Sequence, residues 1–122
     1  MILLLFITAA SVQCPDKTGN QGSINYCAEK ELQKSDAKLS LRLKQTLKIA
    51  AKQDGKGETY AVDTLKASQK AWLVYRDAQC RVESAPVGYM GSLDRYLYLN
   101  CLSAMAEKRT DDLKVLEKAY ER

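Results

Sequence analysis

The chain of 122 residues contains no histidine and only two prolines, one phenylalanine and one tryptophan. The absence of histidine excludes a histidine general base, a Ser-His-Asp triad and any zinc site that uses imidazole. The cysteines include no C-x-x-C pair, so a cysteine-only metal site is also a poor match. Gly55 and Gly57 lack the strand and the spacing of a phosphate-binding loop. We therefore expect no enzyme, no cofactor and no metal ion.

A long apolar run is missing as well. Residues 1–11 (MILLLFITAAS) are uncharged and apolar, but a bilayer-spanning helix needs about 20 residues. An apolar core followed by small residues is typical of a secretory signal peptide, here without the usual basic start. We expect residues 1–11 to be a signal peptide that is truncated or atypical at its start, and residues 12–122 to be one periplasmic or secreted domain. Gln13 argues against lipidation of Cys14.

Apolar residues recur at helical spacing in three long stretches. The first is predicted to begin after Ser23 as N-cap and to end near Asp54, and the second covers about residues 58–84. Residues 85–91 contain one proline and two glycines and cannot continue a helix. The third helix follows Ser92, which is its predicted cap, and the sequence shows no useful strand pattern. The prediction is an all-α, antiparallel bundle of three long helices.

Each predicted helix has one apolar stripe. The first stripe comprises Ile24, Ala28, Leu32, Leu39, Leu43, Leu47 and Ala50. The second comprises Val62, Leu65, Trp72, Tyr75 and Val82, with Ala61, Ala71 and Ala78 beside it. The third comprises Leu99, Leu102, Met105, Ala106, Leu113, Leu116 and Tyr120. These stripes are the predicted core.

Four cysteines, an even number in a short exported chain, predict two disulfides with three possible pairings. The helical layout favours Cys14–Cys27, which would tie the irregular segment before the first helix to its first turn. It also favours Cys80–Cys101, because the connection between the second and third helices reverses the chain and brings these positions face to face. Crosslinks that close such short loops stabilise a fold by about 3 kcal/mol each.

The positive charge is concentrated in one segment. Residues 34–56 contain seven basic and two acidic residues, a charge of +5, so the rest of the chain sums to −1 against a total of +4. Lys44, Lys48 and Lys52 form a ridge at i, i+4 spacing. This ridge is either a solvated helix face or a site for an acidic partner, such as a carboxylate-lined protein cleft, anionic lipid headgroups or an envelope polymer. We do not expect nucleic acid as a partner.

The densest segment surrounds the only tryptophan, in the run Gln69-x-x-Trp72-x-x-x-Arg76-Asp77-x-x-Cys80. We expect Trp72 to pack in the core, with Gln69 making a polar contact near it. Arg76 and Asp77 are sequence neighbours and do not face each other on a helix. Each is therefore expected to pair with another helix, or Asp77 with Arg81 at i+4.

This run, with Ser68, Tyr75 and the segments around Cys27, Cys101 and Arg109, resembles the LprI-type lysozyme inhibitor domain of bacterial envelope proteins. The resemblance covers nearly the whole chain after the signal peptide. It implies a periplasmic or surface-exposed helical domain with internal disulfides that inhibits lysozyme. A lysozyme-type glycoside hydrolase is thus the expected protein partner.

Two surfaces could serve such a function. Tyr89 and Met90, between glycines in the 85–92 loop, could enter the hydrolase cleft, or the loop could simply connect two helices. The alternative function is a non-catalytic envelope binding or stress module that recognises another acidic partner through Lys44, Lys48 and Lys52. The sequence leaves the oligomeric state open, and membrane contact could occur only at the surface.

Overall fold

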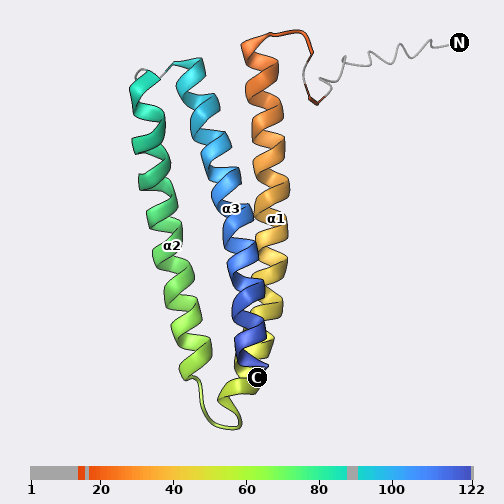
Figure 1. Ribbon diagram of the computed structural model, residues 1–122, viewed down its shortest axis with the longest axis vertical. Helices are drawn as coiled ribbons and strands as arrows, with labels where there is room; N and C mark the ends of the chain where they lie inside the picture. Colours follow the sequence, from red (N-terminus) through yellow and green to blue (C-terminus); the bar gives the residue numbers. More distant parts are fainter. Residues whose placement is uncertain (1–13, 16, 88–90, 122) are drawn as a thin grey trace, which may run out of the picture.

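The computed structural model describes residues 14–15, 17–87 and 91–121. They form three helices, α1 (Gln21–Asp54), α2 (Tyr60–Ser84) and α3 (Ser92–Tyr120), with a short 3₁₀ turn at Ala85–Val87, and this described part contains no strand. The helices run antiparallel to their chain neighbours and lie side by side along the long axis (Figure 1). This confirms the predicted all-α bundle of three long helices. The predicted signal peptide lies outside the described residues.

Helix α1 begins earlier than predicted. Asn20 is its N-cap, and the Asn20 side-chain oxygen accepts a hydrogen bond from the backbone N–H of Ser23 at 3.2 Å. The prediction of Ser23 as the cap is wrong, because Asn20 already supplies the oxygen that the first turn needs. Ser92 is likewise not a cap. It is the first residue of α3, and Gly91 occupies the N-cap position with extended backbone angles.

A residue at the end of α1 caps the start of α2 across the connection between them. The two carboxylate oxygens of Asp54, the last residue of α1, accept hydrogen bonds from the backbone N–H groups of Ala61 (2.6 Å) and Val62 (3.0 Å). The formal N-cap, Thr59, makes no side-chain cap bond. The chain reverses between them with positive φ at Gly55 and Gly57, which only glycine adopts without strain. The predicted stop of the first helix is confirmed here.

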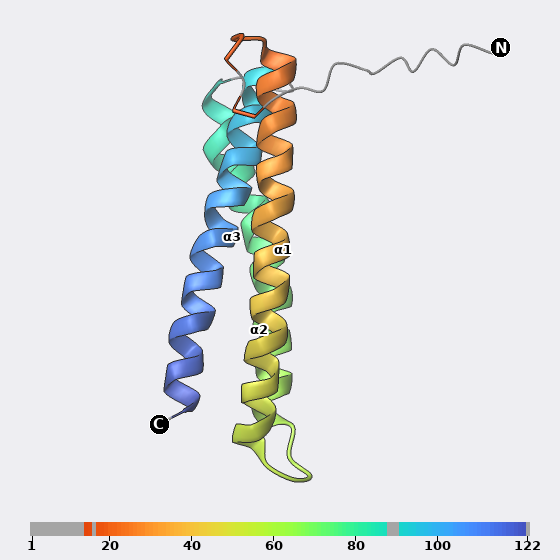
Figure 2. The same cartoon turned by 90° about the vertical axis from the view of Figure 1, so that its right-hand side faces the viewer.

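The core lies along the inner faces of all three helices, and α1 and α3 share the most extensive interface. Figure 2 shows that α3 is inclined to the other two helices. The fully packed core consists of Leu39, Ala50, Ala61, Leu65, Ala106 and Leu113, and partly buried Leu43, Leu47, Val62, Trp72, Leu116 and Tyr120 pack against it. The predicted stripes of α1 and α3 therefore face the core. No helix of the described part is long and apolar enough to cross a membrane.

The predicted stripe of α2 is correct only in its first half. Tyr75 and Val82 are 56% and 67% exposed, and Ala71 and Ala78 are exposed beside them. The buried line of α2 instead follows Leu65, Gln69, Cys80 and Ser84, with Trp72 and Arg76 half-buried. The error has a physical cause: α2 is apolar on two opposite faces, and the polar groups on the buried face have partners that make their burial tolerable.

Candidate functional site

The α2 motif forms a cross-helix cluster rather than an open site. Arg76 donates two hydrogen bonds to the carboxylate of Asp36 in α1, Nη1–Oδ1 at 2.6 Å and Nη2–Oδ2 at 3.4 Å. Its guanidinium also lies 4.9 Å from the centre of the Trp72 ring. The side chain of Arg76 is only 12% exposed, so its charge is largely removed from water and is compensated by Asp36. The prediction that Arg76 pairs with another helix is confirmed.

Arg109 of α3 lies near the same indole, with its guanidinium 5.9 Å from the ring centre of Trp72. Its Nε donates to the side-chain oxygen of Gln69 at 3.0 Å, and its Nη2 donates to the hydroxyl of Ser68 at 3.1 Å. Burial lowers the pKa of this guanidinium, while Asp112 acts in the opposite direction. The predicted polar contact of Gln69 is confirmed, and Trp72 is half-buried against the core. This cluster joins all three helices, and both of its guanidinium groups have hydrogen-bond partners within the protein.

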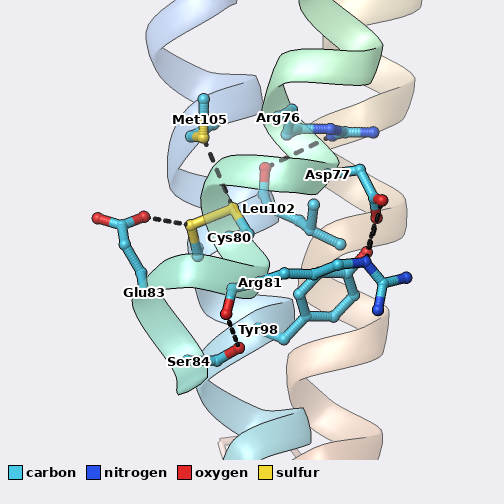
Figure 3. Close-up of a disulfide and its surroundings, with 10 residues drawn as sticks. Arg76, Asp77, Cys80, Arg81, Glu83, Ser84, Tyr98, Leu102 and Met105 are labelled. Atoms are coloured by element: carbon cyan, nitrogen blue, oxygen red, sulfur yellow. Dashed lines mark hydrogen bonds and ion pairs between the residues drawn. A yellow bond between two sulfur atoms is a disulfide. The ribbon is translucent and has the colours of Figure 1, made fainter. Parts of the chain in front are cut away.

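Asp77 lies on the side of α2 that borders α3. Its Oδ1 accepts a hydrogen bond from the hydroxyl of Tyr98 in α3, and its Oδ2 accepts one from Nε of Arg81 at 3.1 Å (Figure 3). The predicted i+4 pair with Arg81 is thereby confirmed. The Tyr98 bond, followed by the Arg81 bond, lowers the pKa of the Asp77 carboxyl. Burial, followed by the bond to Asp77, raises the pKa of Tyr98.

Both predicted disulfides are present. Cys14 and Cys27 are joined with a Cα–Cα distance of 5.4 Å, and Cys80 and Cys101 with one of 5.5 Å. Cys27 belongs to the first turns of α1, Cys80 to the last turns of α2, and Cys101 to the first half of α3. Since the helices are antiparallel, both crosslinks lie at the same end of the bundle (Figure 1). The α2–α3 connection is at this end too, and the Cys80–Cys101 disulfide joins the two helices that flank it.

A carboxylate and a thioether, both of which can bind metal ions, lie beside the Cys80–Cys101 disulfide. The Glu83 carboxylate lies 2.7 Å from Cys101 Sγ, and Met105 Sδ lies 3.5 Å from Cys80 Sγ (Figure 3). Cys80, Glu83 and Cys101 are close enough together to hold a metal ion. The two sulfur atoms are bonded to each other, however, and a disulfide offers no thiolate for coordination. In this state the group is a crosslink and not a metal centre.

The basic face of α1 is open to solvent. Lys44, Lys48 and Lys52 are all exposed, and the ion pairs of the described residues include none of them. Arg42, which forms an i, i+4 row with Lys34 and Lys38, instead binds Glu117 of α3, with Nη1 of Arg42 3.0 Å from Oε2 of Glu117. Arg42 thus takes part in the packing of α1 against α3, whereas Lys44, Lys48 and Lys52 remain exposed. Tyr89 and Met90, the other predicted partner-binding residues, lie outside the described residues.

Sequence reasoning missed two participants in these clusters. It gave no partner for Asp36, and it placed Arg109 only through the family resemblance. Their spacing along the chain carries no signal, because their partners are 40 residues away. It also missed the exposed apolar face of α2, because it assigned Tyr75 and Val82 to the core.

Comparison with known proteins identifies the family. The family model described as lysozyme inhibitor LprI matches residues 14–113. An uncharacterized protein of Rhizobium meliloti (strain 1021) is 33% identical over 132 aligned positions, which cover 98% of this chain and 93% of that protein. No solved structure matches the chain. The matched region begins at the first disulfide cysteine and includes the α2 cluster and Arg109, and the chain therefore belongs to the LprI lysozyme inhibitor family.

Proposed function

We propose that this protein inhibits a lysozyme-type glycoside hydrolase outside the cytoplasm, by binding the enzyme and without catalysis of its own. The observation that carries the proposal is the position of both disulfides at one end of the bundle, around the α2–α3 connection, in a member of a lysozyme inhibitor family. Disulfides persist in oxidising compartments such as the periplasm, which supports export. A crosslinked end is also suited to binding, because its groups lose less conformational freedom on association.

In this proposal the disulfide-bearing end blocks the hydrolase cleft. Lysozyme cleaves its polysaccharide between two carboxyl groups in a cleft, so an element that fills the cleft excludes the substrate. The 85–92 connection, with Tyr89 and Met90, is the proposed inserting element. The Cys80–Cys101 crosslink would hold its base rigid, since Cys80 is fully buried.

The lysine ridge of α1 is the second contact surface to consider. A cationic lysozyme would repel a chain of net charge +4 at long range, so attraction must come from short-range complementarity. Lys44, Lys48 and Lys52 could supply it against cleft carboxylates. Inhibition through the ridge should then weaken as salt is added, whereas insertion of an uncharged loop should respond much less.

The test is a cell-wall lysis assay with the purified, oxidised protein and several lysozyme types. We expect inhibition at near-stoichiometric ratios for at least one type. The variant Tyr89→Ala/Met90→Ala removes the proposed inserting groups, and Lys44→Glu/Lys48→Glu/Lys52→Glu reverses the ridge. Lys56→Glu/Lys66→Glu/Lys118→Glu is the matched control, because it makes the same charge change at exposed lysines outside α1 that also belong to none of the ion pairs of the described residues. Absence of inhibition of every type at a large molar excess would contradict the proposal.

A second candidate function is favoured by the free lysine ridge alone. Exposed lysines without acidic partners in the described fold suit a binding module for another acidic component of the envelope. Co-sedimentation with cell-wall polymer and with vesicles containing anionic lipid would then depend on Lys44, Lys48 and Lys52 while lysozyme remains uninhibited. Retention of binding by the ridge-reversal variant would remove this function.

A further inference from the structure

Helix α2 exposes a second apolar face. Four large side chains on it, Tyr60, Val74, Tyr75 and Val82, are 78%, 71%, 56% and 67% exposed. At about 100° per residue they lie on one side of the helix, opposite Leu65. The exposed positions between them are also uncharged: Thr64, Ala67, Ala71 and Ala78. Figure 1 shows α2 at the edge of the bundle, and no described element covers its outer side.

This face differs from the other exposed apolar residues of the described chain. On α1 and α3 they are spread singly along the helices, which is ordinary for a protein surface: Tyr26, Leu41, Leu93 and Val115. Leu73 is exposed on α2 but lies about 200° around the helix from Ala71, outside this face. The face of α2 is instead continuous along the helix, and an extended exposed apolar patch marks an interaction surface. Its central positions alternate in steps of three and four residues, the heptad spacing by which one helix packs along another. The shape and pattern therefore fit a helix as the covering element.

We propose that a second copy of this chain covers this face, with α2 packed antiparallel against α2 of the second copy. An antiparallel pair centred on the middle of α2, between Trp72 and Leu73, brings Ala71 against Val74 of the second copy. The same register brings Ala67 against Ala78 of the second copy. Small residues then meet small or medium ones at each central layer, and the two helices can approach closely.

The charges beside the face favour the same arrangement. Lys70 and Asp77 flank the face on one side, and antiparallel packing brings like flanks together. Lys70 therefore lies near Asp77 of the second copy, and the same pair recurs by the twofold symmetry. The side chain of Asp77 is 50% exposed and can accept this additional partner. A parallel pair aligns each residue with its own copy and provides no such match.

The proposed dimer leaves the lysine ridge free. Lys44, Lys48 and Lys52 are exposed residues of α1, whereas α2 makes the proposed contact. The dimer would thus present two ridges and two disulfide-bearing ends. Because each chain carries +4, added salt should strengthen the association by screening the repulsion between the copies.

Sedimentation of the oxidised full chain over a range of concentrations tests the proposal. We expect a reversible monomer–dimer equilibrium, and we expect Val74→Lys to raise the dissociation constant by about 100-fold or more, because it places two unpaired charges in a dry contact. Val115→Lys is the matched control, since Val115 is 66% exposed on α3 and the substitution is the same. Circular dichroism should show unchanged helix content in both variants. Lys70→Glu should weaken the dimer more modestly, by a few-fold.

Orientation is tested with a spin label attached at exposed Glu58 through a non-cysteine handle, which leaves the disulfides intact. At 1.5 Å per residue the antiparallel register separates the two labels by roughly 40 Å, whereas a parallel pair holds them within about 15 Å. A parallel distance would overturn the proposal. So would a protein that stays monomeric to about 1 mM, or a dimer that Val74→Lys leaves intact. Loss of lysozyme inhibition by Val74→Lys in a monomeric protein would assign the face to the hydrolase instead.

Discussion

Arg76 of α2 and Asp36 of α1, 40 residues apart in the chain, form a two-point ion pair that joins the two helices. Arg76 is mostly buried, while the Asp36 side chain is 41% exposed, so water screens one partner and not the other. Removing Asp36 leaves a buried guanidinium without its counter-ion. We expect Asp36→Ala to lower the free energy of unfolding by about 2 kcal/mol in urea titrations.

A double-mutant cycle isolates this pair from its surroundings. Arg76→Met keeps much of the apolar contact with Trp72 while removing the charge. The coupling energy between Asp36→Ala and Arg76→Met should be about 1–3 kcal/mol. Glu107→Ala is a control on an exposed carboxylate in the middle of α3 and should change stability by less than about 0.5 kcal/mol. A coupling near zero would show that Trp72 and not Asp36 positions Arg76.

The cap from Asp54 to the start of α2 makes a second prediction. Its carboxylate satisfies two of the four backbone donors that begin the helix, and its negative charge suits the positive end of the helix dipole. We expect Asp54→Ala to cost about 1–2 kcal/mol in thermal or urea unfolding. Thr59→Ala should have little effect, because Thr59 makes no side-chain cap bond. A larger loss of stability in Thr59→Ala than in Asp54→Ala would contradict the assignment of Asp54 as the capping residue.

The apolar pattern of α2 predicted the wrong buried side for the second half of that helix. α1 and α3 each have one apolar face, so their stripes identified the buried side. α2 has two, and Tyr75 and Val82 are more hydrophobic than Gln69 and Ser84, which are buried. Hydrophobicity ranks residues by transfer from water and takes no account of partners such as Arg109, which hydrogen-bonds Gln69. The correct face of α2 therefore depends on residues of another helix.

The disulfides and the lysine ridge could be predicted from the sequence, whereas the ion pair between α1 and α2 could not. The cysteine pairs followed from topology, because three antiparallel helices bring the end of α2 beside the start of α3. The exposure of Lys44, Lys48 and Lys52 followed from their i, i+4 spacing opposite the apolar stripe. The pairing of Arg76 with Asp36 did not, since the sequence cannot fix which residues of two long helices lie at the same height.

The contributions of Tyr98 and Asp77 to the free energy of unfolding are expected to change with pH in opposite directions. The folded-state pKa of Tyr98 is raised, so its contribution is fully present below its unfolded value of about 10 and is lost as pH rises through the folded value. The pKa of Asp77 is lowered, so its contribution is present above about 3.9 and is lost as pH falls through the folded value.

The variant Tyr98→Phe separates the two effects. It removes the raised tyrosine titration, which ultraviolet difference spectra follow at alkaline pH. It also removes the hydrogen bond that contributes most to lowering the pKa of Asp77, so the NMR titration of that carboxyl should move toward its ordinary range. Tyr60→Phe, at a 78% exposed position, is the control and should leave the Asp77 titration unchanged. An Asp77 titration that is the same in Tyr98→Phe would contradict the bond.

The two disulfides should differ in what their removal costs. Their sequence separations of 13 and 21 residues predict similar entropic contributions, about 3 kcal/mol each, if both closed loops are ordered. The described residues between Cys14 and the start of α1 are exposed, however, so that segment can fray without opening the bundle. Cys80 is fully buried and joins α2 to α3. We therefore expect Cys80→Ala/Cys101→Ala to cost about 3 kcal/mol or more, and Cys14→Ala/Cys27→Ala clearly less.

Hydrogen exchange locates the difference along the chain. Amides at the end of α2 should lose protection in Cys80→Ala/Cys101→Ala, because the crosslink no longer holds that end against α3. In Cys14→Ala/Cys27→Ala the loss should be confined to the first turns of α1. If the inhibitory element lies on the α2–α3 connection, only the first variant should also weaken lysozyme inhibition at a temperature where both remain folded. Loss of inhibition confined to Cys14→Ala/Cys27→Ala would instead place the contact at the N-terminal disulfide.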